Sequence, residues 1–215
     1  MSNNDTEGNN GIRYRRHRDD ERAAGRRTIL DVAGRLLAEE GVAALTMRRL
    51  AVAVGSSTTV LYTLFGDKDG LAHELYLEGC ARLRHALEAV PPAAPLDLLA
   101  ALAWAYRENA LANPTYYGVM FERAIPGFVP SAASVERTYT SFLVILRAMR
   151  DAMDTGVLTP GDAVAATDLF WAAGHGLLGL ERAGYFTTAE EARKRYSLGI
   201  AVVLRGLGGQ VPPER

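Results

Sequence analysis

The sequence predicts an all-α fold of about nine helices. Apolar residues recur at spacings of three and four through most of its 215 residues, which is the period of an amphipathic helix. Runs that alternate apolar and polar residues, typical of half-buried strands, are absent. Glycine and proline separate the helical segments. With 48% hydrophobic residues, the chain can build a small domain joined to a larger one.

The first two helices follow from their apolar stripes and end signals. The stripe of the first helix consists of Ile29, Val32, Ala33, Leu36 and Leu37. Gly41 ends this helix as a C-cap. Thr46 is a natural N-cap for the second helix, and Gly55 breaks it. The buried stripe of the second helix is expected at Met47, Leu50, Ala51 and Val54.

A third, short helix is predicted from Ser57 to Phe65, with Leu61 and Phe65 facing the core. Two short helices joined around a glycine, after a longer helix that packs across them, form a three-helix helix-turn-helix unit. In such a unit the second short helix enters the major groove of DNA. No acidic residue lies between Ala43 and Gly66, as a phosphate-facing surface requires.

Six further helices are predicted, at residues 68–90, 96–113, 114–123, 132–154, 162–183 and 189–207. Prolines end the first of these six and open the third. We therefore expect a disordered basic arm over residues 1–21, a helix-turn-helix DNA-binding domain over 22–82, and a larger helical domain for ligand binding and dimerisation over 83–210.

Charge and composition narrow the function classes. The net charge is −1, but seven arginines lie between Arg13 and Arg27. These arginines are consistent with two interpretations, contact with DNA phosphates and a solvated N-terminal arm. Because the N-terminus is polar and no uninterrupted apolar run approaches the roughly 18–20 residues that span a membrane, we expect neither a secretory signal nor a membrane-spanning segment. Its four histidines are dispersed, without a catalytic grouping, phosphate loop or metal-ligand spacing. We expect a cytoplasmic protein that is not an enzyme and needs no cofactor or metal.

One cysteine, Cys80, excludes an intrachain disulfide. Cys80 is interpreted as a small apolar residue of a helix, with redox sensing as the alternative.

The segment from Arg26 to Leu71 carries a specific motif. It has a glycine, a serine two residues later, then Leu-Tyr-x-x-Phe and Lys-Asp-x-Leu, at Gly55, Ser57, Leu61, Tyr62, Phe65, Lys68, Asp69 and Leu71. This spacing resembles the DNA-binding domain of the TetR family of transcriptional regulators. The chain departs from the family pattern at Ser56, Thr59 and Leu64. These departures leave the expected fold unchanged, but the operator sequence cannot be predicted.

The resemblance implies a DNA-contacting surface. Phosphate contacts are expected from Thr46, Tyr62 and Lys68, with Arg48 as a further candidate for DNA contact. The expected base-reading residues are Ser57, Thr58, Thr59 and Thr63, since hydroxyls bond base edges and a threonine methyl can touch thymine.

The second domain is rich in aromatic residues on aliphatic helices. Such residues are core residues or line an apolar pocket. The pocket candidates are Trp104, Tyr117, Phe121, Phe142, Trp171 and His175. The segment Trp171 to Gly176 resembles the Trp-His-Gly signature of one TetR-family C-terminal domain. His175 either faces a ligand or is a hydrogen-bonded core residue beside Trp171.

The last two helices carry more apolar surface than one domain needs. The resemblance implies that they pair with their two-fold mates in a homodimer. The interface candidates are Leu177, Leu180, Ile200, Val203 and Leu204.

Together these features predict a repressor released from a palindromic DNA operator by a small, largely apolar effector. The effector is expected to act by moving the long helix that begins at Lys68. The alternatives are an activator of the same family and a helical protein-interaction module that does not bind DNA.

Overall fold

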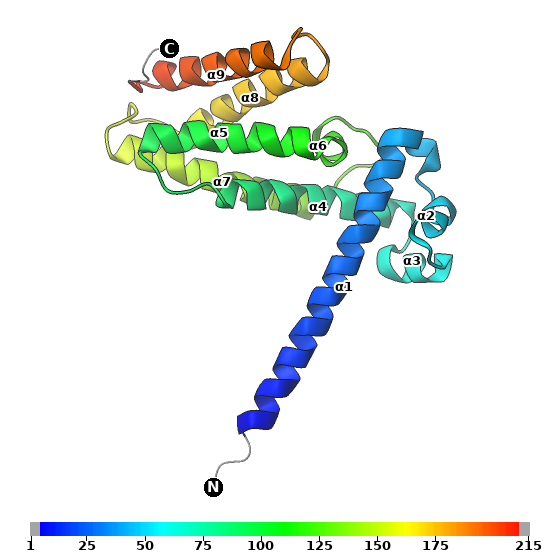
Figure 1. Cartoon of the computed structure of the whole chain (residues 1–215). Helices are drawn as coiled ribbons and strands as arrows, with labels where there is room; N and C mark the ends of the chain where they lie inside the picture. Colours follow the sequence, from blue (N-terminus) through cyan, green and yellow to red (C-terminus); the bar gives the residue numbers. More distant parts are fainter. Residues whose placement is uncertain (1–4, 211–215) are drawn as a thin grey trace. The chain divides into compact units, whose positions relative to one another are not determined.

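The computed structural model describes residues 5–210, with side chains from Glu21 onward (Figure 1). The helices are α1 (Asp5–Glu40), α2 (Met47–Val54), α3 (Thr58–Phe65), α4 (Lys68–Glu88), α5 (Pro95–Ala112), α6 (Pro114–Phe121), α7 (Ala132–Asp154), α8 (Ala163–Arg182) and α9 (Ala189–Gly206). A 3₁₀ turn, η1 (Val42–Ala44), follows α1. The described residues contain no strand, so the predicted all-α fold is confirmed.

The N-terminal segment differs from the expected disordered arm. Helix α1 begins at Asp5, so residues 5–21 have helical backbone. No proline interrupts residues 5–40, and arginine and alanine, which have high helix propensity, are frequent there. Residues 21–25 are exposed. The first four residues of the expected arm lie outside the described residues.

The described chain divides into two compact units. The head consists of the residues up to Gly79 together with Thr115–Pro130, and the body consists of Cys80–Pro114 together with the residues from Ser131 onward. Helix α4 contributes its first part to the head and its second part to the body.

Most of α6 and the loop after it belong to the head, whereas the sequence predicted residues 83–210 as one domain. In the head, the Tyr116 hydroxyl donates a hydrogen bond to Asp31 of α1 at 2.9 Å. Gly79 lets Met120 approach α4 closely, since a Cβ atom at residue 79 would lie 2.7 Å from the Met120 sulfur. These contacts join residues that are distant in sequence.

Capping explains where α2 and α3 begin and end. The Thr46 and Ser57 hydroxyls accept hydrogen bonds from the third backbone N–H of α2 and α3, at 3.2 and 3.3 Å. Gly55, with φ of 65°, closes α2 in the left-handed conformation that glycine adopts without strain. The predicted cap at Thr46 and the glycine break at Gly55 are confirmed, and Ser57, predicted as the start of the third helix, is its N-cap.

The head core packs α1, α2, α3 and the start of α4. The fully buried leucines of this core are Leu45, Leu50, Leu61, Leu71 and Leu75. Arg26 of α1 reinforces the packing, because its guanidinium donates to the Leu64 carbonyl at 3.0 Å and pairs with Glu74 at 2.8 Å. The same guanidinium lies 4.9 Å from the centre of the Phe65 ring.

In the body, α8 lies against α9 and α7, and α5 contacts α7, α8 and α9. Figure 1 shows α8 and α9 side by side. The largest fully buried side chains of this core include Tyr196, Phe170, Leu99, Leu102 and Ile145. Buried Cys80 forms a hydrogen bond with Thr138 at 3.1 Å, and its carbonyl accepts one from Ser141. This packing supports the interpretation of Cys80 as a structural residue.

Candidate nucleic-acid interface and aromatic cluster

The residues predicted to contact DNA are all exposed on the head. They are Thr46, Arg48, Ser57, Thr58, Thr59, Tyr62, Thr63 and Lys68. Tyr62 is 54% exposed although it belongs to a residue type that is usually half-buried. The buried side of α3 is formed by Leu61 and Phe65, as predicted. The packing of α3 thus leaves a polar, hydroxyl-rich side free.

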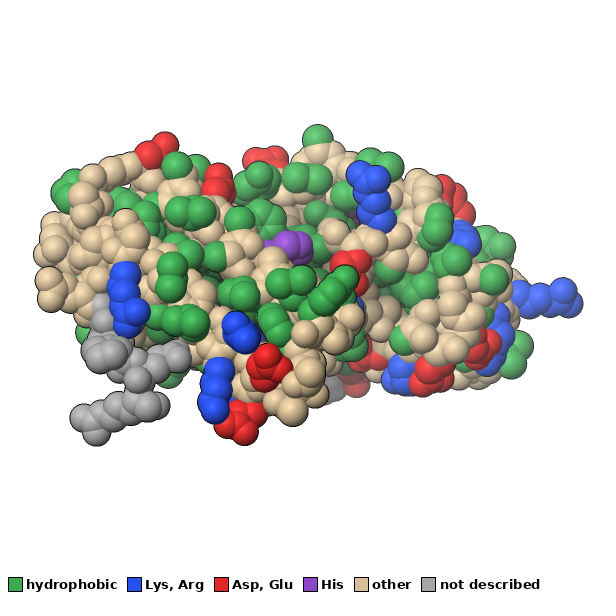
Figure 2. Space-filling model, turned by 90° about the horizontal axis from the view of Figure 1, so that it is seen from above, with side chains coloured by type: hydrophobic (Ala, Val, Ile, Leu, Met, Phe, Trp, Pro, Cys, Tyr) green, Lys and Arg blue, Asp and Glu red, His purple; other side chains and the backbone are tan. Residues whose placement is uncertain are grey.

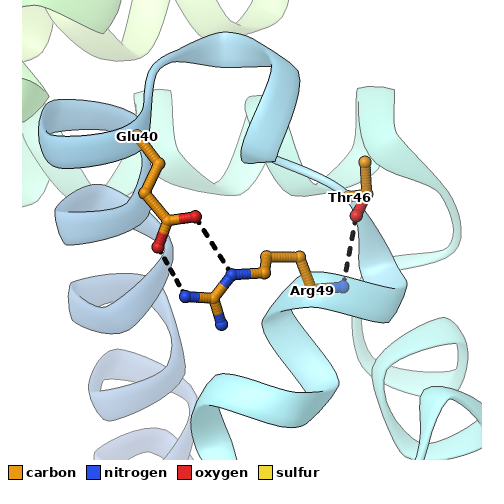
Figure 3. A network of polar contacts seen from close by, with 3 residues as sticks. All are labelled: Glu40, Thr46 and Arg49. Atoms are coloured by element: carbon orange, nitrogen blue, oxygen red, sulfur yellow. Dashed lines mark hydrogen bonds and ion pairs between the residues drawn. The ribbon is translucent and has the colours of Figure 1, made fainter.

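The start of α2 is held by a small polar network (Figure 3). Arg49 donates from Nε to Glu40 at 3.1 Å and forms a second bond to the same carboxylate through its Nη2. Hydrogen bonding from Arg49 lowers the pKa of the Glu40 carboxyl. A lowered pKa in the folded state means that the pair favours folding above the usual carboxyl pKa and loses this effect as the pH falls through the lowered value.

This network has a consequence for charge at the interface. Glu40 neutralises Arg49, whereas the neighbouring Arg48 is exposed and no ion pair is described for it. Helix α2 contains no acidic residue, and its N-terminal N–H groups carry partial positive charge. The helix start therefore combines backbone donors with a guanidinium that can reach an anion.

The side chains of α3 differ in what they can offer to a partner. The Ser57 oxygen is engaged as the cap of the helix. The Thr63 hydroxyl donates to the Thr59 carbonyl at 2.9 Å, so its hydrogen is engaged within the helix. Val60 is 45% exposed on this helix and was absent from the predicted site. A prediction restricted to polar side chains misses such a residue, because the signal it offers is an apolar side chain on the exposed side of the helix.

An aromatic cluster lies between α5, α7 and α8 of the body. Phe142 packs on Trp171, with ring centres 4.8 Å apart. The Trp171 indole N–H donates to the Tyr106 hydroxyl at 3.2 Å, and that hydroxyl lies 2.9 Å from Nδ1 of His175. Three of the predicted pocket residues, Phe142, Trp171 and His175, are thus brought together around Tyr106, which the prediction omitted.

The other predicted pocket residues lie elsewhere. Trp104 packs on Tyr196, with ring centres 5.4 Å apart, and Arg193 lies 4.8 Å from the Trp104 ring centre. Tyr117 and Phe121 belong to the head, where their rings lie 5.1 Å apart. The candidates thus fall into three groups: Phe142, Trp171 and His175 around Tyr106, Trp104 on Tyr196, and Tyr117 with Phe121 in the head. Helical spacing identified residues that pack inward but did not indicate which of them meet.

The space at the cluster is almost filled. A cavity of about 10 Å³ lies there, close to the smallest that holds one water molecule. Its lining residues are Ala103, Tyr106, Ile145, Phe170, Trp171, Gly174, Tyr196 and Ile200. A wider surface cleft of about 380 Å³ lies at the connection from α7 to α8, between Arg150 and Val164, and none of the predicted pocket residues lines it.

Helices α8 and α9 carry an apolar surface, and Figure 2 shows hydrophobic side chains spread over the face on which they lie. The exposed large residues of these two helices are Val164, Leu169, Leu180, Leu198 and Val202. Of the predicted interface residues, Leu180 is exposed, and Leu177 and Val203 are half-buried. Ile200 and Leu204 are buried at 5% and 1%, which corrects their placement at an interface, because they face the core of their own chain.

Helix α8 is also the one described helix that is long and apolar enough to cross a membrane, with a mean hydropathy of 1.2 in its most apolar window. Only 28% of that window is buried. The exposed carboxylate of Asp168 lies within the helix, and α9 packs along it. These features fit a helix that is partly covered by its own chain.

Two known domain families match the chain, one in its N-terminal part and one in its C-terminal part. Residues 29–75 match the family described as bacterial regulatory proteins, tetR family. Residues 99–203 match the tetracyclin repressor-like C-terminal domain. The first match spans α2, α3 and all of the residues predicted to contact DNA, and the second includes the aromatic cluster.

Individual proteins resemble the chain over different lengths. The HTH-type transcriptional repressor Rv1474c of Mycobacterium tuberculosis is 43% identical over 65 residues, which are 30% of this chain and 35% of that protein. A protein of unknown function from Rhodococcus sp. RHA1 has a solved structure that is 29% identical, with a TM-score of 0.74 over 85% of this chain and 94% of its own.

A third protein shares the fold alone at lower identity. The TetR family transcriptional regulator PfmR from Thermus thermophilus is 22% identical, with a TM-score of 0.67 over 86% of this chain and 99% of its own. The two family matches together cover most of the chain from Ile29 to Val203. The chain belongs to the TetR family of transcriptional regulators.

Proposed function

We propose that this protein is a sequence-specific DNA-binding repressor that acts as a homodimer and is released from a near-palindromic operator by a small, largely apolar ligand. The observation that carries the proposal is α3, an exposed helix with a hydroxyl-rich side and no charged residue. The name of the Mycobacterium tuberculosis relative, a transcriptional repressor, supports repression rather than activation. An operator on chromosomal DNA implies action in the cytoplasm.

Phosphate contacts would hold α3 in the groove. The capped N-terminus of α2, exposed Arg48 and exposed Lys68 provide backbone donors and two cations. Contacts of this kind set the register of a protein on DNA without reading sequence. The Tyr62 hydroxyl would add a neutral donor to the same phosphate backbone.

The exposed apolar residues of α8 and α9 support a two-fold dimer. Leu169, Leu180 and Val202 would be buried if the two helices met their mates. Gly176 of α8 has open space around its Cα, so a partner helix could approach closely there. A dimer carries two copies of α3, and half-sites one helical turn apart, about 34–36 Å, accept two such helices on one side of DNA.

The aromatic cluster around Tyr106 supports the effector site. Its rings are apolar, while the hydroxyl of Tyr106 and the imidazole of His175 could orient a polar group of a ligand. The cavity of about 10 Å³ cannot accept such a ligand, so side chains must move when it binds. A ligand that binds an opened form better than the closed form shifts the population between the two.

The proposed release acts through α4. This helix begins at Lys68 in the head and continues without interruption to Glu88 in the body. A rearrangement of the body that displaces the second part of α4 would displace Lys68, and DNA affinity would fall by the difference in binding between the two states.

Footprinting tests the proposal. The purified full chain is titrated against genomic fragments at several salt concentrations. We expect protected sites with dyad symmetry that compete against random DNA. Uniform binding that depends only on salt would contradict a specific regulator, because phosphate attraction alone produces that behaviour.

A tyrosine pair makes the test specific for α3. Tyr62→Phe removes one hydroxyl from the exposed side of α3, and Tyr139→Phe makes the same change on α7, where Tyr139 is 64% exposed. A hydrogen bond to a charged phosphate contributes about 1.5–3 kcal/mol, so we expect Tyr62→Phe to weaken operator binding at least about tenfold and Tyr139→Phe to leave it unchanged. Equal affinities of the two variants would remove Tyr62 from the interface.

A further inference from the structure

The exposed side of α3 has an unusual chemistry for a helix that reads DNA. It carries hydroxyl and methyl groups from Thr58, Thr59, Val60 and Thr63, and the phenol of Tyr62. The sequence of α3, TTVLYTLF, contains no arginine, lysine, asparagine, glutamine or carboxylate. The bidentate pairs that recognise guanine and adenine use those side chains, so α3 cannot form them.

Hydrogen bonds within the helix limit the polar groups further. The Thr63 hydroxyl donates its hydrogen to the Thr59 carbonyl, and the Ser57 oxygen accepts a hydrogen bond from the Val60 N–H. Thr59 and Thr63 are one helical turn apart, and both lie roughly opposite buried Leu61. The methyl groups of the two threonines and of Val60 therefore make up much of what this surface can place against a base edge.

Among the four bases, thymine alone presents a methyl group in the major groove, at C5. Apolar side chains and threonine methyls recognise it by contact. We propose that α3 reads its half-site chiefly through thymine methyl groups, with Val60 and Thr63 as the residues that determine specificity. The inference rests on the proposed DNA binding and adds to it the kind of base under α3.

The test uses DNA that differs only in that methyl group. A pool of duplexes with a randomised core is selected on the purified full chain, and the selected duplexes are prepared again with deoxyuridine in place of thymidine. Uracil pairs as thymine does but lacks the C5 methyl. We expect the uracil duplexes to bind more weakly by about fourfold for each buried methyl that is lost.

Scanning single thymine-to-uracil changes locates the contacts. The loss should concentrate at one or two positions in each half-site and be absent outside them. Val60→Ala should weaken binding to the thymine duplex at least about fourfold, bind the uracil duplex as the unchanged protein does, and no longer distinguish the two at its position. Alanine is a better helix former than valine, so the exposed substitution keeps α3 folded.

Two further variants separate the explanations. Thr63→Ser removes a methyl and keeps the hydroxyl, so it should lose the discrimination between thymine and uracil at a second position if the Thr63 methyl contacts the base, and keep that discrimination if another side chain contacts it. Val129→Ala makes the same change as Val60→Ala at a loop residue of the head that is 81% exposed, and it should behave as the unchanged protein does.

The outcomes distinguish this inference from the proposed function. Enrichment of specific duplexes whose thymine and uracil forms bind equally would overturn methyl reading and leave the repressor proposal standing. Discrimination that survives in both Val60→Ala and Thr63→Ser would assign the contact to another element and overturn it as well. If no duplex is enriched, both proposals fail.

Discussion

Gly70, in the first turn of α4, is constrained by a single backbone oxygen. A Cβ atom at this position would collide with the Phe65 carbonyl at the end of α3. The neighbouring Asp67 carboxylate accepts a hydrogen bond from the Gly70 N–H at 2.8 Å, so the turn is held from both sides. The glycine thus permits the close connection between α3 and α4.

We expect Gly70→Ala to destabilise the protein by about 1–3 kcal/mol, because the backbone must shift to relieve the collision. Gly25→Ala is the matched control. Gly25 lies inside α1 with nothing within 4 Å of an added Cβ, so alanine should stabilise that helix by about 0.5–1 kcal/mol. Urea unfolding of the two variants measures both effects, and a neutral Gly70→Ala would show that the turn relaxes easily.

At the scale of elements, α5 and α8 are joined by a buried ion pair. Arg107 donates from Nε to Glu181 at 2.8 Å and bonds the second carboxylate oxygen through Nη2. Its side chain is 4% exposed, and its guanidinium lies 5.4 Å from the centre of the Trp104 ring. With both oxygens engaged, the carboxylate compensates a cation that is removed from water.

Glu181→Ala should destabilise the protein by about 3–5 kcal/mol, since it leaves a buried guanidinium without its carboxylate. Glu190 offers the contrast, because it pairs with exposed Lys194 at 2.7 Å within α9. Glu190→Ala should change the free energy of unfolding by about 0.5 kcal/mol or less. Thermal or chemical unfolding compares the two, and similar effects would mean that water reaches the Arg107 pair.

The elements themselves were largely predictable, because their signals are local. The caps Thr46 and Ser57, the breaks at Gly55 and Gly66, and the apolar stripes each depend on residues within a few positions. The contacts between residues that are distant in the sequence were not predictable. Arg107 and Glu181 are 74 positions apart, and no local pattern indicates that α5 meets α8 at these residues.

The candidate site shows the same division. Exposure of the α3 residues predicted to contact DNA followed from the amphipathic pattern of that one helix, so it could be predicted from the sequence. The pairing of His175 with Tyr106 depends on two helices that are distant in the sequence. Helical periodicity assigned Ile200 and Leu204 to an apolar face of α9 but could not tell whether that face meets its own chain or a second copy.

For the whole molecule, the apolar surface of α8 and α9 predicts the oligomeric state. Leu169→Glu combined with Val202→Glu places two charges where a partner would be packed, so we expect a monomer that loses most of its operator affinity. Leu111→Glu, at a leucine of α5 that is 40% exposed, should leave the dimer intact. Sedimentation and DNA titration test this, and a dimeric double variant would place the interface elsewhere.

The nearly closed cavity at Tyr106 would also set the dose at which the proposed sensor responds. A site filled by its own side chains is competent only in the fraction of molecules that have opened. If about 1% of molecules are open, the ligand concentration for half-response is about 100 times the dissociation constant of the open form. A tightly closed cavity would then keep the repressor from responding to low concentrations of ligand.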